Sequence, residues 1–391
     1  MPPLPESYRI ESGDIERIMT PALLIYPAVV ERNIQATLKL ADGDPKRWRP
    51  HLKTAKIPAV IRMLVATGVR NVKCSTTLEL LVACQEGAAD VLLAFSVTGA
   101  NARRTVQIGK SYPQTRVSVL VETAEQLNIW KGEDIGIFLD INSGMNRTGM
   151  SQDRTGAIVA LAKLAGRQFR GLHYYDGHMA GVSPAERETK AHEGYRWITN
   201  LAESVANAGL TVEEIITSGT PAAPYALSFP GFHDAPFIHR ISPGTVVYND
   251  MTSLEQLPGL GYAPAALVLS SVVSHPTATT ITCDAGHKSV SADAGVPTCA
   301  VVGHENFTPL KPSEEHLPIS CGAPGARPAI GSELYLLPRH VCPTVNNFDE
   351  AIFIRDHRIC GVERVAARGH EVLAVSNTVP PPVWAAGTHR S

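Results

Sequence analysis

Short β-rich runs alternate with amphipathic helical segments from about residue 27 to residue 250. Extended runs are expected at 48–52, 70–74, 90–95, 115–121, 134–141, 169–175, 213–217 and 239–248. Helices are expected between them, for example at 28–40, 56–67, 76–87, 154–165 and 184–208. Eight β-runs separated by helices predict a parallel (β/α)8 TIM barrel in the α/β class. An open doubly wound sheet is the alternative, but no Gly-x-Gly-x-x-Gly follows the first strand.

The pattern changes after residue 250. Residues 262–301 alternate apolar and small polar residues, helical periodicity largely disappears, and strand-like runs follow at 333–337 and 350–354. This pattern predicts a C-terminal all-β domain. We therefore expect a barrel at 27–250 and a β-domain at 251–391, the latter joined by a strand from residues 1–26.

Composition narrows the classes of partner. The net charge is −2, with no basic block and no acidic tail, so neither nucleic acid nor an anionic membrane is an expected partner. No apolar run reaches the roughly 18 residues that span a bilayer, and the first residues do not resemble a signal peptide. The seven cysteines are scattered, which favours free thiols and a cytoplasmic location.

A lysine follows the first predicted strand of the barrel. Pro50 disfavours helix for the residue before it, so residues 48–52 are expected to be extended and Lys53 to lie at the strand end. Parallel barrels present catalytic groups from that position. A partly desolvated amine there has a lowered pKa and can form a Schiff base with an aldehyde cofactor. A strand-end surface lysine is the alternative.

Polar residues follow several other predicted strands. They are Arg147 in the loop 142–149, Tyr175 and His178 after 169–173, Ser218, Gly219 and Thr220 after 213–216, and Gly244 and Thr245 in the last strand region. Small residues at two neighbouring strand ends expose backbone N–H groups, which suits a phosphate. Ordinary Ser/Gly/Pro turns remain the alternative for either loop alone.

A second set of residues lies in the predicted β-domain. If residues 336–346 are extended, His340 and Cys342 point to the same side and can bind one ion. An imidazole and a thiolate favour zinc over magnesium or calcium. Two protein ligands leave positions for water or substrate, as in catalytic sites. The alternative is a buried cysteine beside a hydrogen-bonded histidine.

Together these segments resemble the D-threonine aldolase and D-serine dehydratase family of metal-activated, fold-type III pyridoxal 5′-phosphate (PLP) enzymes, whose N-terminal domain is similar to that of alanine racemase. The resemblance implies that Lys53 is the Schiff-base residue, that Arg147 contacts the cofactor ring, and that Tyr175 is the strand-end tyrosine. It implies phosphate contacts from Ser218, Gly219, Thr220, Gly244 and Thr245. It also implies a divalent metal on His340 and Cys342, with zinc favoured and manganese, magnesium or cobalt as alternatives, and a homodimer.

Two departures bear on the reaction. The aldolase branch usually has an aspartate where this chain has Cys342, and it carries a histidine beyond the tyrosine where this chain has Ala180 and Gly181, leaving only His178 nearby. A third departure, Ala55 in place of a family histidine, favours neither reaction. We therefore expect β-elimination from 3-hydroxy-D-amino acids, with Lys53, Tyr175 and His178 as catalytic candidates, over retro-aldol cleavage to glycine and an aldehyde.

Two further functions remain open. An amino-acid racemase would not need the metal pair, and a cofactor-binding homeostasis protein would not need the second domain. The substrate within the class of small 3-hydroxy amino acids is not determined; a second carboxylate would need an added cation, for which Lys288 and Arg339 are candidates.

Overall fold

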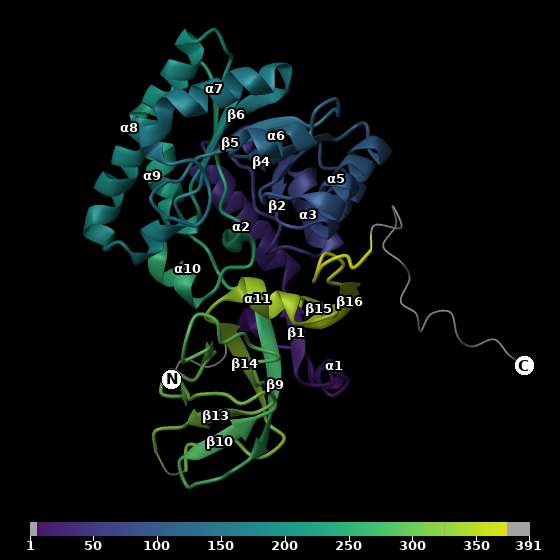
Figure 1. Cartoon of the computed structure of the whole chain (residues 1–391). Coiled ribbons are helices and arrows are strands. Elements are labelled where there is room, and N and C mark those ends of the chain that lie inside the picture. The colour runs from purple at the N-terminus through teal and green to yellow at the C-terminus, as the bar shows by residue number, and fades with distance from the viewer. Residues whose placement is uncertain (1–5, 324, 374–391) are drawn as a thin grey trace, which may run out of the picture.

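The first lobe of the computed structural model is a barrel surrounded by helices (Figure 1), and the structure describes residues 6–323 and 325–373. Seven parallel strands pair in chain order: β2 (Asn71–Cys74), β3 (Asp90–Leu93), β4 (Arg116–Val121), β5 (Gly136–Asp140), β6 (Phe169–Tyr174), β7 (Glu214–Thr217) and β8 (Ile238–Ile241). Residues 48–52 close the ring, because Trp48 bridges Ile241 and His51 bridges Lys73. The predicted (β/α)8 barrel is confirmed, with its first strand reduced to isolated bridges.

Helices cover the outside of the barrel. They are α2 (Pro27–Leu40), α3 (Pro58–Ala66), α4 (Thr77–Gln85), α5 (Gly99–Ser111), α6 (Ala124–Ile129), α7 (Thr155–Ala165), α8 (Pro184–Asn207), α9 (Ala223–Ser228) and α10 (Met251–Gln256). Proline opens three of the long ones, where its missing N–H costs nothing. The Thr76 hydroxyl accepts from Glu79 N–H and caps α4, while Gly87 follows that helix with φ +82°. The five helices predicted at 28–40, 56–67, 76–87, 154–165 and 184–208 agree with these bounds to within two residues.

The last predicted β-run was too long. Residues 239–248 were expected to be extended, but β8 ends at Ile241 and a 3-10 turn occupies Thr245–Val247. Pro243 has no N–H for a ladder, so the strand ends before it. The residues after this strand therefore form a loop at the barrel mouth.

The second lobe is a nine-stranded sheet: β1 (Ala22–Ile25), β9 (Ala266–Ser274), β10 (Thr280–Cys283), β11 (Cys299–Val301), β12 (Thr308–Pro309), β13 (Leu317–Ser320), β14 (Glu333–Pro338), β15 (Glu350–Arg355) and β16 (Arg358–Arg364). Strand β1 pairs with β9 and β15, so the early extended run does join this sheet. The predicted C-terminal β-domain is confirmed, and it contains one short helix, α11 (Val341–Asn346), after β14. The domain boundary at 250/251 stays a prediction.

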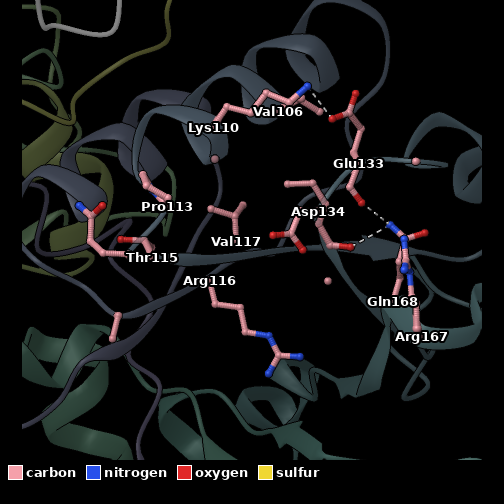
Figure 2. A pocket seen from close by; sticks show the side chains of 16 residues that line it. Val106, Lys110, Pro113, Thr115, Arg116, Val117, Glu133, Asp134, Arg167 and Gln168 are labelled. Atoms are coloured by element: carbon pink, nitrogen blue, oxygen red, sulfur yellow. Dashed lines mark hydrogen bonds and ion pairs between the residues drawn. The ribbon is translucent and has the colours of Figure 1, made fainter.

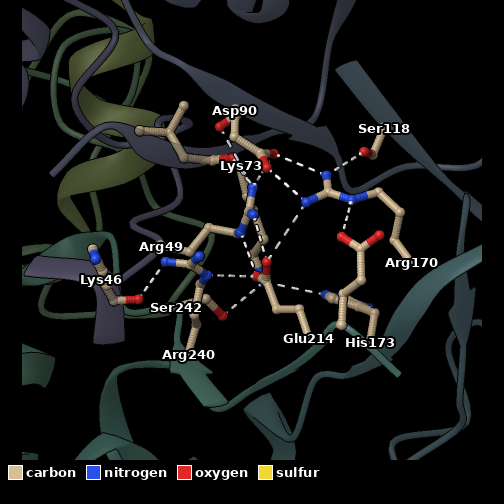
Figure 3. A network of polar contacts seen from close by, with 12 residues as sticks. Lys46, Arg49, Lys73, Asp90, Ser118, Arg170, His173, Glu214, Arg240 and Ser242 are labelled. Carbon is tan, nitrogen blue, oxygen red and sulfur yellow. Dashed lines mark hydrogen bonds and ion pairs between the residues drawn. The ribbon is translucent and has the colours of Figure 1, made fainter. Parts of the chain in front are cut away.

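Charged side chains fill the interior of the barrel (Figure 3). Arg49, which is completely buried, donates to both Glu214 oxygens at 2.7 and 2.8 Å and to Asp90 at 2.9 Å. Arg170 pairs with Asp90 at 2.7 Å, and Arg240 with Glu214 at 3.0 Å. Paired hydrogen bonds of this kind are needed for buried charges to be tolerated. The cluster fixes the segment that leads into Lys53.

Two general expectations can be compared with the structure. All seven cysteines are free thiols, as the sequence predicts. Among the described residues, no helix combines the length and the apolar composition that a membrane crossing requires.

Candidate active site

Lys53 lies in a turn at the carboxyl end of the barrel, directly after the closing segment. Its backbone N–H donates to His51 Nδ1 at 3.2 Å, and the residue is half-buried. Its amine is close enough to Lys73 and Cys342 for its charge to lower the pKa of both groups. The structure therefore places Lys53 at the barrel mouth, as the sequence predicts.

Tyr175 forms one wall of this mouth. The Arg147 guanidinium lies over the tyrosine ring at 4.9 Å from its centroid. Two glycines make room for the ring, since a Cβ at Gly177 would lie 2.5 Å from it and one at Gly219 3.1 Å from it. The structure thus brings together three segments predicted separately.

His178 belongs to the short 3-10 turn Gly177–Gly181 that follows Tyr175. Burial lowers its pKa, which favours the neutral imidazole near pH 7. Its Nδ1 is buried and has no hydrogen-bond partner among the described residues. The ring adjoins Gly144 in the loop that carries Arg147. A neutral imidazole with an unpartnered nitrogen is available to accept a proton or a hydrogen bond.

The first predicted phosphate loop, which follows β7, has one polar group without a hydrogen-bond partner among the described residues. Ser218 has φ +57°, a backbone conformation that is strained for serine, and its buried hydroxyl has no described partner. The Gly219 N–H is already used, because it donates to Asp176 Oδ1 at 3.1 Å. Thr220 begins the following 3-10 turn. The Ser218 hydroxyl is the clearest vacant donor of this loop.

Gly244 has a packing role that the sequence did not reveal. A Cβ there would collide with the carbonyl oxygen of His51, so glycine lets the last loop approach the closing segment. This close approach sets Thr245 beside the turn that carries Lys53.

The two residues predicted to bind a metal lie close together, in a geometry other than the predicted one. His340 is the extended N-cap residue of α11 and Cys342 lies in the first turn of that helix, so the segment is not a continuous strand. Strand pairing ends with β14 at Pro338, and the residues that follow form the helix α11 instead of a further strand. The two side chains nevertheless lie close enough for each to shift the pKa of the other.

The electrostatics of this pair describe an imidazolium beside a thiolate, so a metal would displace a proton from His340 on binding. Burial lowers the pKa of His340, but Cys342 and Asp293 together raise it to about 9. Burial raises the pKa of Cys342, but His340, Lys53 and Thr54 lower it below its ordinary value. Asp293 Oδ2 lies 2.6 Å from His340 Nδ1 and so leaves Nε2 for a ligand. No third histidine, cysteine or acidic residue completes a metal-binding group within the part of the chain that the structure describes.

Cys342 links the two lobes at the site. Its Sγ lies 3.0 Å from the hydroxyl of Thr54, the residue after Lys53, and 3.6 Å from that of Thr245. The sequence separates Cys342 from Thr54 by 288 positions. The lysine, one phosphate-type loop and the metal pair thus share one mouth.

Four polar residues of the mouth were missed by the sequence reasoning. Lys73, His173 and Asp140 lie on β2, β6 and β5, and Ser242 follows β8. Burial, and next the charge of Lys53, lower the pKa of Lys73 to about 7. The available signal was a lysine between Val72 and Cys74 inside the predicted strand 70–74, because both faces of a barrel strand are covered.

Other candidates lie away from the mouth. Lys288 pairs with Glu314 and Glu315 on the surface, and Arg339 Nε donates to the Pro297 carbonyl. A hollow lined by Lys110, Arg116 and Glu133 opens at the amino ends of β4 and β5 (Figure 2), opposite the end that carries Lys53. Two of its cations are paired, Lys110 with Glu133 and Arg116 with Glu213.

Comparisons with known proteins agree with this arrangement. Residues 25–251 match the family model described as alanine racemase, N-terminal domain, and residues 265–354 match the putative serine dehydratase domain. The chain is 27% identical to a D-threonine aldolase of an Arthrobacter species, over 92% of this chain and 95% of that protein. It is 24% identical to the D-threo-3-hydroxyaspartate dehydratase of a Delftia strain, over 84% and 92%.

A solved structure shares the fold over both lobes. The D-threonine aldolase of Filomicrobium marinum superposes with a TM-score of 0.83 at 25% identity, covering 92% of this chain and 98% of that one. The chain belongs to the family of D-threonine aldolases and D-serine dehydratases, lyases that join an alanine racemase-type barrel to a serine dehydratase domain.

Proposed function

We propose that this chain is a PLP-dependent and divalent metal-dependent lyase of 3-hydroxy-D-amino acids, which it converts by β-elimination to a 2-oxo acid and ammonia. The observation that carries the proposal is the contact between Thr54 and Cys342. It joins the turn of Lys53 to the thiol of the metal pair. An amine and a metal acting on adjacent atoms of one small substrate require such proximity.

The residues of the mouth fit the cofactor. Lys53 supplies the amine that would anchor its aldehyde, and Arg147 and Tyr175 supply a cation and an aromatic face for its ring. The buried, unpartnered Ser218 hydroxyl is a donor that a phosphate would satisfy. Thr220, Gly244 and Thr245 complete the proposed phosphate loops, and Gly219 positions the first of them through Asp176.

The pair of His340 and Cys342 fits zinc. Imidazole and thiolate are ligands that zinc prefers, and the lowered pKa of Cys342 favours the thiolate that a metal binds. Two protein ligands leave coordination positions for water and for the substrate hydroxyl. PLP supplies an electron sink for charge at Cα, and zinc supplies a Lewis acid for the β-hydroxyl.

The chain's own groups carry the proton transfer. Lys53, once released from the cofactor, takes the Cα proton of the substrate. Loss of that proton and of the β-hydroxyl removes one water; hydrolysis then consumes one water and releases the 2-oxo acid and ammonia. The Arg147 guanidinium and the Tyr175 ring stack on one side of the mouth. No base at the β-hydroxyl is needed for this course.

Retro-aldol cleavage is the second candidate. It requires a base that removes the proton of the β-hydroxyl. His178 has the neutral imidazole and the unpartnered nitrogen for that role. The resemblance to D-threonine aldolases also favours it. The products then are glycine and an aldehyde.

A product panel separates the candidates. The purified protein is incubated with D- and L-serine, threonine and 3-hydroxyaspartate, with PLP, and with either zinc or a chelator. Chelator-sensitive release of ammonia together with a 2-oxo acid from the D-isomers supports the proposal. Glycine without ammonia overturns elimination, and chelator-insensitive racemisation overturns the lyase. Lys53→Ala removes the visible absorption of bound cofactor; persistence of that absorption would contradict the anchoring role. We also propose that the protein is a homodimer. Light scattering after size-exclusion chromatography measures the mass of the particle and tests this.

A further inference from the structure

Lys73, His173 and Ser242 belong to a chain of hydrogen-bonded polar side chains in the barrel interior (Figure 3). Lys73 is 1% exposed, and its Nζ lies 3.2 Å from His173 Nε2 and donates to Ser242 Oγ at 2.7 Å. His173 Nδ1 lies 2.7 Å from Asp140 Oδ1. Ser242 donates in turn to the carbonyl of Ser218 at 2.7 Å. These hydrogen bonds therefore connect residues on or directly after four barrel strands, β2, β5, β6 and β8, with the first phosphate-type loop.

The order of donors and acceptors determines which of these side chains carry a proton. The Asp140 carboxylate accepts from His173 Nδ1, so Nε2 of a neutral imidazole accepts from Lys73. Burial and the charge of Lys73 lower the pKa of His173, which agrees with the neutral form. A lysine ammonium has three N–H donors. His173 and Ser242 accept two of them, and no described residue accepts the third.

Lys73 differs from the buried arginines of the barrel interior and from the buried Lys56. Arg49, Arg170 and Arg240 each pair directly with Asp90 or Glu214, and the buried Lys56 pairs with Glu79 at 2.7 Å. Lys73 forms no ion pair with a described carboxylate and reaches Asp140 only through His173. An unpaired buried ammonium is costly to folding, so a purely structural role would be better served by an apolar residue.

The position of Lys73 relates it to the cofactor. Its Nζ lies 5.1 Å from the centroid of the Tyr175 ring, the same ring that Arg147 covers. We propose that Lys73 is a positioning residue for PLP, an inference that rests on the proposed function. The third N–H and the positive charge of Lys73 face an acceptor atom on the cofactor ring. His173 and Asp140 hold it there.

Several charges surround Lys73. The cations are Lys53, Arg147 and Arg49, and the anions are Asp140 and Asp176. The imidazoles of His51 and His173 also face it. Among these groups, the nitrogen that Lys53 contributes to the bound cofactor is itself positive when protonated. The charge of Lys73 therefore favours loss of that proton. Removing the Lys73 charge raises the apparent pKa of this nitrogen, which the pH dependence of the visible absorption measures.

The test compares Lys73→Met with the matched variant Lys56→Met in the PLP-loaded protein. Lys73→Met should raise the pH midpoint of the visible absorption by about one unit and weaken PLP binding by about tenfold at pH 7. Binding is measured by fluorescence titration of the apoprotein with PLP. Lys56→Met removes a charge that Glu79 already neutralises, so it should lower the melting temperature without moving the midpoint.

A second variant covers the case in which Lys73→Met does not fold. Lys73→Gln removes the same charge but keeps an N–H donor for His173, so it should move the midpoint in the same direction. A folded Lys73→Met with the wild-type midpoint and PLP affinity overturns the proposal, as does an unmoved midpoint in Lys73→Gln where that variant decides. If the wild-type protein develops no visible absorption with PLP, the proposed function itself fails.

Discussion

Glu214 should be the most stability-sensitive carboxylate inside the barrel. It is 2% exposed, accepts two hydrogen bonds from Arg49 and pairs with Arg240. Three buried arginines, Arg49, Arg170 and Arg240, face the two buried carboxylates Asp90 and Glu214. Glu214→Gln keeps the shape of the side chain but leaves these arginines with one carboxylate. Arg49→Met, by contrast, leaves two arginines with two carboxylates.

The magnitude follows from that charge balance. Removing one partner from a buried ion pair costs about 3–5 kcal/mol, because a charge is left uncompensated away from water. We expect this loss for Glu214→Gln. Arg49→Met breaks more hydrogen bonds but leaves the charges balanced, so we expect about 2 kcal/mol. With an unfolding entropy of about 2.1 cal/mol/K per residue, a loss of 4 kcal/mol lowers the melting temperature by about 5 °C.

The assay is thermal unfolding followed by circular dichroism at pH 7. Glu31→Gln is the matched control, because Glu31 is 52% exposed and pairs with the half-exposed Arg355 on the surface. Surface pairs contribute about 0–1 kcal/mol, so this control should melt within about 1 °C of the wild type. Equal melting temperatures for the two glutamine variants, or a larger loss in Arg49→Met, would refute the charge-balance reasoning.

Three further predictions concern the site. Asp293→Asn should weaken zinc binding about 10- to 100-fold, because Asp293 orients His340; competition with a chromophoric chelator measures this, and unchanged affinity would exclude the orienting role. Gly244→Ala should lower both the melting temperature and the visible absorption with PLP, because the new methyl group collides with the His51 carbonyl; wild-type values for both would contradict it. Burial raises the pKa of Asp176 to about 6, above its unfolded value of about 3.9, so its contribution to stability is present below pH 4 and is lost as the pH rises through 6. Between pH 4 and 7, Asp176→Asn should therefore lose less stability than the wild type in melting experiments, and parallel pH profiles would count against this.

Local patterns were sufficient for most of the elements. Helices begin and end near the predicted residues because proline, threonine and glycine at their ends act within one turn of backbone. The error at 239–248 has a local cause as well, since Pro243 ends the strand. The error at His340 and Cys342 came from extending a strand through α11, where the apolar residues Val341 and Val345 fit helix as well as strand.

The sequence by itself determined the order of strands and helices, the barrel, and the position of Lys53 at a strand end. Each of these depends on residues close together in the chain, where propensity and periodicity act. Only the tertiary structure decided that Cys342 meets Thr54, and that Lys73 is buried beside His173 without an ion pair to a described carboxylate. Contacts across hundreds of residues depend on how the two lobes pack and on which side chains face inward from different strands. Neither of these is encoded in the spacing of residues along one segment.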